Sequence, residues 1–106
     1  MQNSYTIEYG RKFLEELRKS FLFVANVPME ASLNERKLIL NAIEELKEFP
    51  YRGPIDNELE TANHSIHKLV IKGGRYIVLY SVDDHIINVR LLLDARRDNA
   101  HIKDLL

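Results

Sequence analysis

The sequence contains no cysteine, and this absence excludes disulfide bonds and metal sites built on thiolates. No window approaches the roughly 20 apolar residues that a membrane-spanning helix needs. Residues 1–5 lack a basic stretch followed by an apolar run, so we expect no signal peptide. The 15 basic and 16 acidic residues leave a net charge of −1, which predicts no strong nonspecific attraction to nucleic acid. Together these absences predict a cytoplasmic protein without membrane contact.

The composition that remains suits one small globular domain covering residues 1–106. Apolar residues make up 45% of the chain, enough for a packed core. The charge is unevenly distributed: Glu44–Glu60 holds six acids and two bases, whereas His64–Val82 holds three bases, two histidines and no acid. A nearly neutral chain can therefore present a basic sheet, although ordinary solvated charges explain the same pattern.

Hydrophobic periodicity predicts a strand followed by two helices in the first half of the chain. Polar and apolar residues alternate over Tyr5–Tyr9, as in a strand with one buried face. From Arg11 to about Asn26, apolar residues recur at three- and four-residue steps, which indicates an amphipathic helix. An S-x-x-E capping box at Ser32 predicts the start of a second helix, which ends at Pro50. The short connection favours an antiparallel helix hairpin.

The second half is predicted to form a loop over Tyr51–Asn63 and then three antiparallel strands. The strands cover Ser65–Lys72, Tyr76–Val82 and Ile86–Leu93, with turns at Gly73-Gly74 and Asp83-Asp84. The last strand is expected to alternate without interruption, and its two faces are Ile87, Val89, Leu91 and Leu93, and Ile86, Asn88, Arg90 and Leu92. Residues 98–106 are expected to form a short helix that buries Ile102, Leu105 and Leu106.

This order predicts an α+β fold, in which an N-terminal strand and a helix hairpin precede a C-terminal strand meander, with the helices on one face of the sheet. The opposite face is expected to carry polar residues and the functional site. The four scattered histidines lie near no carboxylate motif, so we expect no metal site and no cofactor.

Four segments carry a resemblance to a known family: Phe49–Gly53, His67–Ile71, Gly74–Asp84 with its G-R-Y and V-D-D motifs, and Val89–Asp98 with its A-R-R-D ending. Their order and spacing resemble the RelE/ParE superfamily of type II toxin–antitoxin toxins, which serve plasmid or chromosomal stabilisation. The resemblance implies a cognate antitoxin as partner, and contact with operator DNA only through that antitoxin.

The superfamily has two functional branches, and the residues favour the ParE-like one. RelE-like members cleave mRNA on the ribosome and need several basic residues and a stacking aromatic on the open sheet face, to stabilise phosphate charge and move protons. Their central strand has arginine after the tyrosine, where this chain has Ile77, and the last aromatic here is Tyr80. ParE-like members inhibit DNA gyrase through a binding surface. Two alternatives stay open: a ribonuclease with the substitute set Lys68, Arg75 and His101, and a non-toxic member that acts only with its antitoxin.

Two groups of side chains are candidates for binding. The resemblance favours Arg75, Arg90, Arg96 and Arg97 as target contacts, although a turn position or a solvated loop also explains most of them. Apolar residues beyond one stripe of the second helix suggest an antitoxin-docking surface made of Leu33, Leu38 and Leu40.

Overall fold

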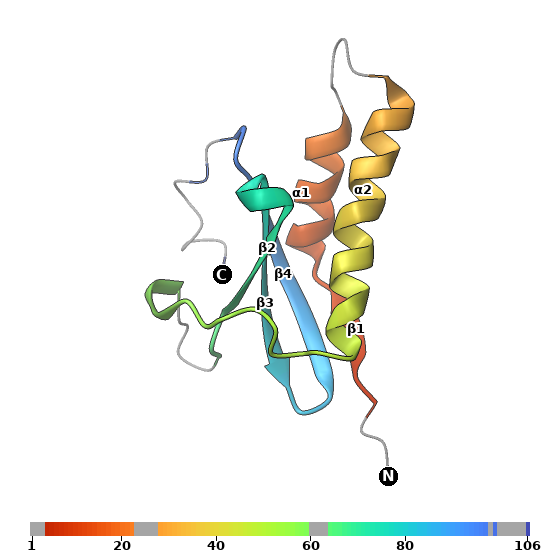
Figure 1. Ribbon diagram of the computed structural model, residues 1–106. Helices are drawn as coiled ribbons and strands as arrows, with labels where there is room; N and C mark the ends of the chain where they lie inside the picture. The colour runs from red at the N-terminus through yellow and green to blue at the C-terminus, as the bar shows by residue number, and fades with distance from the viewer. Residues whose placement is uncertain (1–3, 23–27, 60–63, 98, 100–105) are drawn as a thin grey trace.

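Two helices pack against one face of a four-stranded mixed sheet (Figure 1). The computed structural model describes residues 4–22, 28–59, 64–97, 99 and 106 of the chain. The elements are β1 (Thr6–Tyr9), α1 (Arg11–Leu22), α2 (Met29–Glu44), β2 (His67–Ile71), β3 (Tyr76–Asp83) and β4 (Ile86–Asp94), with 3-10 turns at Glu45–Lys47, Asn57–Leu59 and Lys72–Gly74. The sheet order is β1-β4-β3-β2, in which β1 runs parallel to β4 and the other pairs are antiparallel. The predicted α+β architecture is confirmed.

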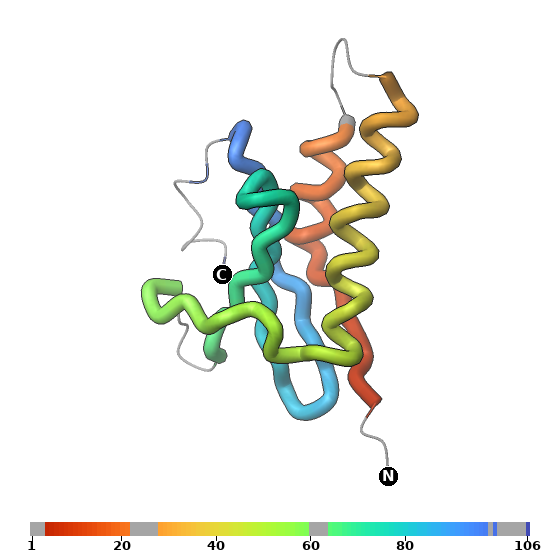
Figure 2. The backbone as a smooth tube through the Cα atoms, in the orientation of Figure 1, coloured from red at the N-terminus to blue at the C-terminus, as the bar shows by residue number. Residues whose placement is uncertain are grey.

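The helices run antiparallel to each other, and both contribute to the main core (Figure 2). Three- and four-residue spacing places Phe13 and Leu17 on one side of α1, and Ile39 and Ile43 on one side of α2. These side chains meet buried residues of the sheet, which are Leu69, Ile71, Tyr76, Val78, Tyr80, Ile87, Val89 and Leu92. Burial of this apolar surface is what holds the hairpin on the sheet.

The N-cap of the second helix lies four residues earlier than the sequence pattern predicts. Pro28 occupies the N-cap of α2 with φ −58°, and its carbonyl accepts the amides of Ala31 and Ser32. The first N–H groups of a helix have no partner within the helix. Proline has no backbone N–H, so it suits a helix start. Ser32 therefore lies inside the helix, and the predicted capping box is wrong. Glu35 makes contacts with the sheet instead.

A β-bulge in β4 interrupts the expected alternation of the last strand. Leu79 pairs with Leu91, but Tyr80 pairs with Val89, so Arg90 is the extra residue. Beyond the bulge Leu92, rather than Leu91, joins Val89 in the core under the helices. The prediction of uninterrupted alternation is therefore wrong after Arg90, because one inserted residue exchanges the two faces of a strand.

The sheet face opposite the helices is apolar at its centre, where the sequence predicts polar residues, and Lys68, Ser81 and Arg90 lie around that centre. Leu79 and Leu91 are buried there with Ile66, and the partly buried residues around them are Leu59, Ile77, Leu93 and Leu106. The predicted terminal helix falls on residues 98 and 100–105, which lie outside the described part of the chain.

Both hairpin turns use positive φ angles. Gly73 and Gly74 have φ of 63° and 100°, as expected for this dipeptide, and Lys72 shares the conformation at 54°. The β2–β3 connection has four residues, since Ile71 pairs with Tyr76. The β3–β4 turn consists of residues 84 and 85, one residue later than predicted, because Asp83 is already paired within the sheet.

We predict that Gly53→Ala destabilises the fold by about 2 kcal/mol, because overpacking a tight contact costs energy of this order. A Cβ on Gly53 would lie 2.7 Å from the Lys68 carbonyl oxygen and 3.1 Å from the Tyr80 hydroxyl. Urea unfolding measures the change. Gly73→Asn is the control, because a Cβ there meets nothing within 4 Å and asparagine tolerates positive φ. Equal unfolding midpoints for the two variants would contradict the close packing at Gly53.

Candidate functional site

A cluster of charged residues surrounds the Tyr76 hydroxyl at the end of the sheet that carries the β2–β3 turn. Tyr76 begins β3 and pairs with Asp94, the last residue of β4. The cluster draws on α2, the turn and both strands, and we call it the Tyr76 cluster: Glu35, Lys72, Arg75, Tyr76, Asp94 and Arg96. The Tyr76 hydroxyl donates to Glu35 Oε1 at 2.8 Å and accepts from Arg96 Nη2 at 3.3 Å. Glu35 Oε1 also accepts from Lys72 Nζ at 3.1 Å.

These hydrogen bonds give Tyr76 a structural role, and its hydroxyl is not suited to transfer protons. Burial, together with the hydrogen bond to Glu35, raises the pKa of Tyr76 to about 12. The same hydrogen bond is the main reason that the pKa of Glu35 is lowered. At neutral pH the hydroxyl is therefore a neutral donor and the carboxylate a charged acceptor, and neither titrates near the pH at which acid–base catalysis would operate.

Asp94 is buried, with 2% of its surface exposed, and is paired with Arg96. Its carboxylate accepts the Arg96 side chain through two hydrogen bonds, from Nε at 3.0 Å and from Nη2 at 2.7 Å, and also accepts the Arg96 amide at 3.0 Å. Burial raises the pKa of Asp94, but the hydrogen bonds and charge of Arg96 outweigh it and lower the pKa below its usual value. The pair therefore stays ionised at neutral pH.

Arg75 differs from the other cations of the cluster in its partners. Its guanidinium carbon lies 5.8 Å from the centre of the Tyr76 ring, as does that of Arg96. Arg75 Nε is nevertheless buried without a hydrogen-bond partner, and no carboxylate in the described part of the chain forms an ion pair with this side chain. The positive charge of this half-buried side chain is therefore not neutralised by an ion pair within the described part of the chain.

The four arginines predicted to contact a target do not form one patch. Arg75 and Arg96 meet at Tyr76, whereas Arg97 turns toward α1 and contacts Glu16 Oε2 at 3.0 Å. Arg90 lies at the bulge, where it donates to Ser81 Oγ at 3.3 Å and to the Leu106 carbonyl at 3.2 Å. The structure therefore brings together two of the four.

The substitute ribonuclease set is also dispersed. Lys68 pairs with Asp56 at 3.4 Å. Lys68 pairs with Leu79, and Arg75 lies four residues before Leu79, so the two cations are about 13 Å apart along the strand direction. His101 lies outside the described residues.

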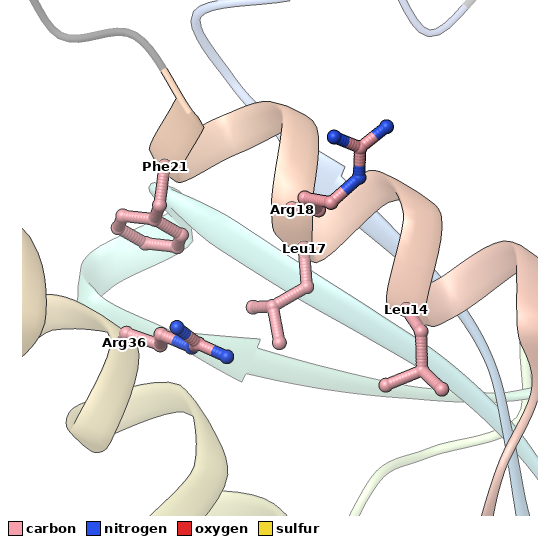
Figure 3. A pocket seen from close by; sticks show the side chains of 5 residues that line it. All are labelled: Leu14, Leu17, Arg18, Phe21 and Arg36. Atoms are coloured by element: carbon pink, nitrogen blue, oxygen red, sulfur yellow. The ribbon is translucent and has the colours of Figure 1, made fainter.

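A groove between α1 and α2 forms a second candidate site (Figure 3). Its volume is about 380 Å³, and Leu14, Leu17 and Phe21 of α1 provide its apolar lining. Arg18 and Arg36 flank these side chains, and neither has a carboxylate partner within residues 4–22, 28–59, 64–97, 99 and 106. An apolar groove bordered by two unpaired cations is suited to an amphipathic segment that carries acids.

The leucines predicted to dock an antitoxin lie on different sides of α2. Leu33 and Leu38 are both exposed, but a spacing of five residues places them about 140° apart around the helix. Leu40 is half-buried against the core on the same side as Leu33. Leu14, whose side chain is 49% exposed and lines the groove, is not among the predicted docking residues. The sequence feature that could identify Leu14 is a second apolar stripe in α1, but such a stripe is difficult to distinguish from residues that pack in the core.

Neither a metal centre nor a membrane span is found in the described residues. No group of three or more metal-ligating side chains occurs among them. None of the helices that they form is long and apolar enough to cross a bilayer.

We predict that Asp94→Asn lowers the free energy of unfolding by about 2 kcal/mol at pH 7, because Arg96 loses its buried partner. The folded-state pKa of Asp94 is lowered, so its stabilisation is present above the unfolded pKa of about 3.9 and is lost as pH falls through the folded pKa. Urea unfolding of wild type and variant should differ at pH 7, and the difference should shrink progressively as pH falls below about 3.9. Glu15→Gln, which breaks an exposed pair with Arg11, should change little at any of these pH values. A difference that is as large in acid as at pH 7 would contradict the ionic role.

Comparisons with known proteins agree with this geometry. Residues 7–99 match the family described as ParE toxin of type II toxin-antitoxin system, parDE, and no curated protein matches. A chromosomal ParDE toxin–antitoxin structure from P. aeruginosa is similar, with a TM-score of 0.70 and 13% identity over 88% of this chain and 98% of that chain. A mutant of the E. coli toxin RelE in the free state has a TM-score of 0.57 and 16% identity over 94% and 93%. The RelE–RelB complex from Pyrococcus horikoshii has a TM-score of 0.57 and 17% identity over 90% of this chain and 99% of that chain.

At these sequence identities the similarity to solved structures shows the fold alone. The family match, in contrast, spans most of the sequence. The chain therefore belongs to the ParE toxin family of type II toxin–antitoxin systems.

Proposed function

We propose that this toxin inhibits DNA gyrase by binding to it in the cytoplasm, and that a cognate antitoxin neutralises the toxin. The observation that carries this choice is the apolar centre of the sheet face opposite the helices. Leu79 and Leu91 are buried in that face, and Ile77 and Leu93 pack beside them. Lys68 and Arg90 lie on the same face, but Lys68 is paired with Asp56, and Arg90 donates to Ser81 and to the Leu106 carbonyl. Cations that are already engaged are poorly placed to stabilise the charge that develops on a phosphate during cleavage.

The positions of the aromatic residues also favour binding over mRNA cleavage. Tyr76 and Tyr80 belong to the core under the helices, and both are fully buried. They are therefore not placed to stack on a base at the opposite face. Lys68 is engaged by Asp56. The alternative function, an endonuclease acting on ribosome-bound mRNA, has no supporting arrangement among the described residues.

Arg75 is the residue that we assign to target contact. Its side chain is half-buried and forms no ion pair within the described residues, so a carboxylate or phosphate of the target would complement its charge. Arg96 contacts the same Tyr76 ring as Arg75 and adds positive charge beside it. Its own pairing with Asp94 leaves it mainly a structural role.

The α1–α2 groove is the surface that we assign to the antitoxin. The similar structures include a ParDE toxin–antitoxin system and a RelE–RelB complex. Here an antitoxin helix would insert apolar anchors against Leu14, Leu17 and Phe21 and place acids near Arg18 and Arg36. Contact with operator DNA would then occur through the antitoxin.

We predict that the purified chain inhibits DNA supercoiling by gyrase and causes cleaved DNA to accumulate. Arg75→Ala should weaken the inhibition at least about tenfold, because arginines at interface centres contribute strongly. The matched control is Arg11→Ala, an exposed arginine of the same charge at the start of α1, and it should inhibit like wild type. In cells, expression should stop growth and induce a DNA-damage reporter. Growth arrest with a silent reporter and new transcript ends would instead indicate mRNA cleavage.

We predict that Leu14→Asp abolishes protection by the antitoxin, because the added carboxylate enters an apolar groove. Affinity for the antitoxin, measured by calorimetry, should fall about 100-fold, and Arg36→Glu should weaken it less. Leu38→Asp introduces the same change at an exposed position on the side of α2 that faces away from the groove. This variant is expected to bind the antitoxin normally. Loss of affinity in Leu38→Asp rather than Leu14→Asp would place the antitoxin on the other side of the helix.

A further inference from the structure

Residues 48–52 follow the 3-10 turn after α2, at the opposite end of that helix from the β2–β3 turn (Figure 1). Their side chains form an exposed aromatic patch. Phe49 and Tyr51 are 54% and 62% exposed, large values for aromatic side chains. They line a depression of about 510 Å³ together with Glu48, Pro50 and Arg52. None of these residues lines the α1–α2 groove or belongs to the Tyr76 cluster.

The rings of this patch are held in place by neighbouring side chains. The Arg52 guanidinium lies 4.9 Å from the centre of the Phe49 ring and forms an ion pair with Glu45 at 2.7 Å. Tyr51 packs against the ring of His67 at 5.7 Å. That ring is buried, and its Nδ1 donates to the Gly53 carbonyl at 2.6 Å. Exposed aromatics that are already positioned lose little conformational entropy when a partner binds.

The surroundings of the patch are acidic. Residues 44–59 contain five acids and two bases, a net charge of −3. Lys47 and Arg52 are paired with Glu44 and Glu45, and Asp56 is paired with Lys68. The side chain of Glu48, which lines the depression, has no cationic partner among the described residues. The uncompensated negative charge disfavours nucleic acid and favours a cationic ligand.

We propose that this acidic aromatic patch, made of Glu48, Phe49, Pro50, Tyr51 and Arg52, docks a segment of a partner protein in which lysine or arginine stands beside proline or other apolar residues. The cation would lie over the Tyr51 ring and pair with Glu48, and the apolar residues would cover Phe49. This contact is separate from the proposed antitoxin groove and does not depend on the gyrase proposal. It adds a binding surface of opposite charge to the arginine-bordered groove.

The test uses the full-length chain and a pair of synthetic ten-residue peptides, Pro-Arg-Leu-Pro-Arg-Leu-Pro-Arg-Leu-Pro and the same peptide with glutamate in place of arginine. Heteronuclear NMR titration should show that the basic peptide binds and shifts the resonances of residues 48–52, whereas the acidic peptide does not bind. Tyr51→Ala should weaken the basic peptide at least about tenfold, as expected for an aromatic anchor. Glu48→Lys should weaken it to a similar extent.

Matched controls separate this surface from general effects of charge and folding. Glu15→Lys makes the same charge change at an exposed site on α1 and should leave peptide affinity within about twofold. Circular dichroism of each variant should match wild type, because the mutated side chains are exposed. Equal binding of both peptides, binding of neither, or full affinity in Tyr51→Ala would overturn the proposal. Self-association of the chain that disappears in Tyr51→Ala would also overturn it, since the occupant would then be a second copy.

Discussion

The single extra residue in β4 is the constraint on which the arrangement of this protein depends. Because Arg90 is inserted opposite the Leu79–Tyr80 step, Val89 and Leu92 both face the helices. The same shift directs Asp94 to the helix side, where it meets Arg96 and lies beside the start of β3. In an uninterrupted strand that carboxylate would lie on the other face, and the Tyr76 cluster would lose the buried acid that pairs with Arg96.

The bulge also explains why the centre of the second sheet face is apolar. It moves Leu91 to that face, where Leu91 completes a cluster with Ile66 and Leu79. The sheet thus has an apolar centre on both sides, whereas the cations of the second face, Lys68 and Arg90, are engaged by Asp56 and Ser81.

The surfaces proposed for binding differ in character. The groove between the helices combines an apolar lining with two arginines that have no carboxylate partner in the described residues, whereas the patch at residues 48–52 combines aromatic rings with one unpaired acid, Glu48. Arg75 adds a third element, a buried donor without an acceptor. The near-zero net charge of the chain conceals these differences, because the opposite charges cancel in the sum but are separated in space.

The sequence by itself determined the order and type of the elements, because hydrophobic periodicity is a local property of the chain. It also determined where the glycine turn lies and the resemblance to the RelE/ParE superfamily, which depends on motif order. Only the tertiary structure decided which residues form the sites. Tyr76 meets Glu35 across 41 positions, and Arg97 meets Ser20 across 77. Contacts at such separations, and a bulge defined by the register of two strands, follow from packing of the whole chain and have no local signal in the sequence.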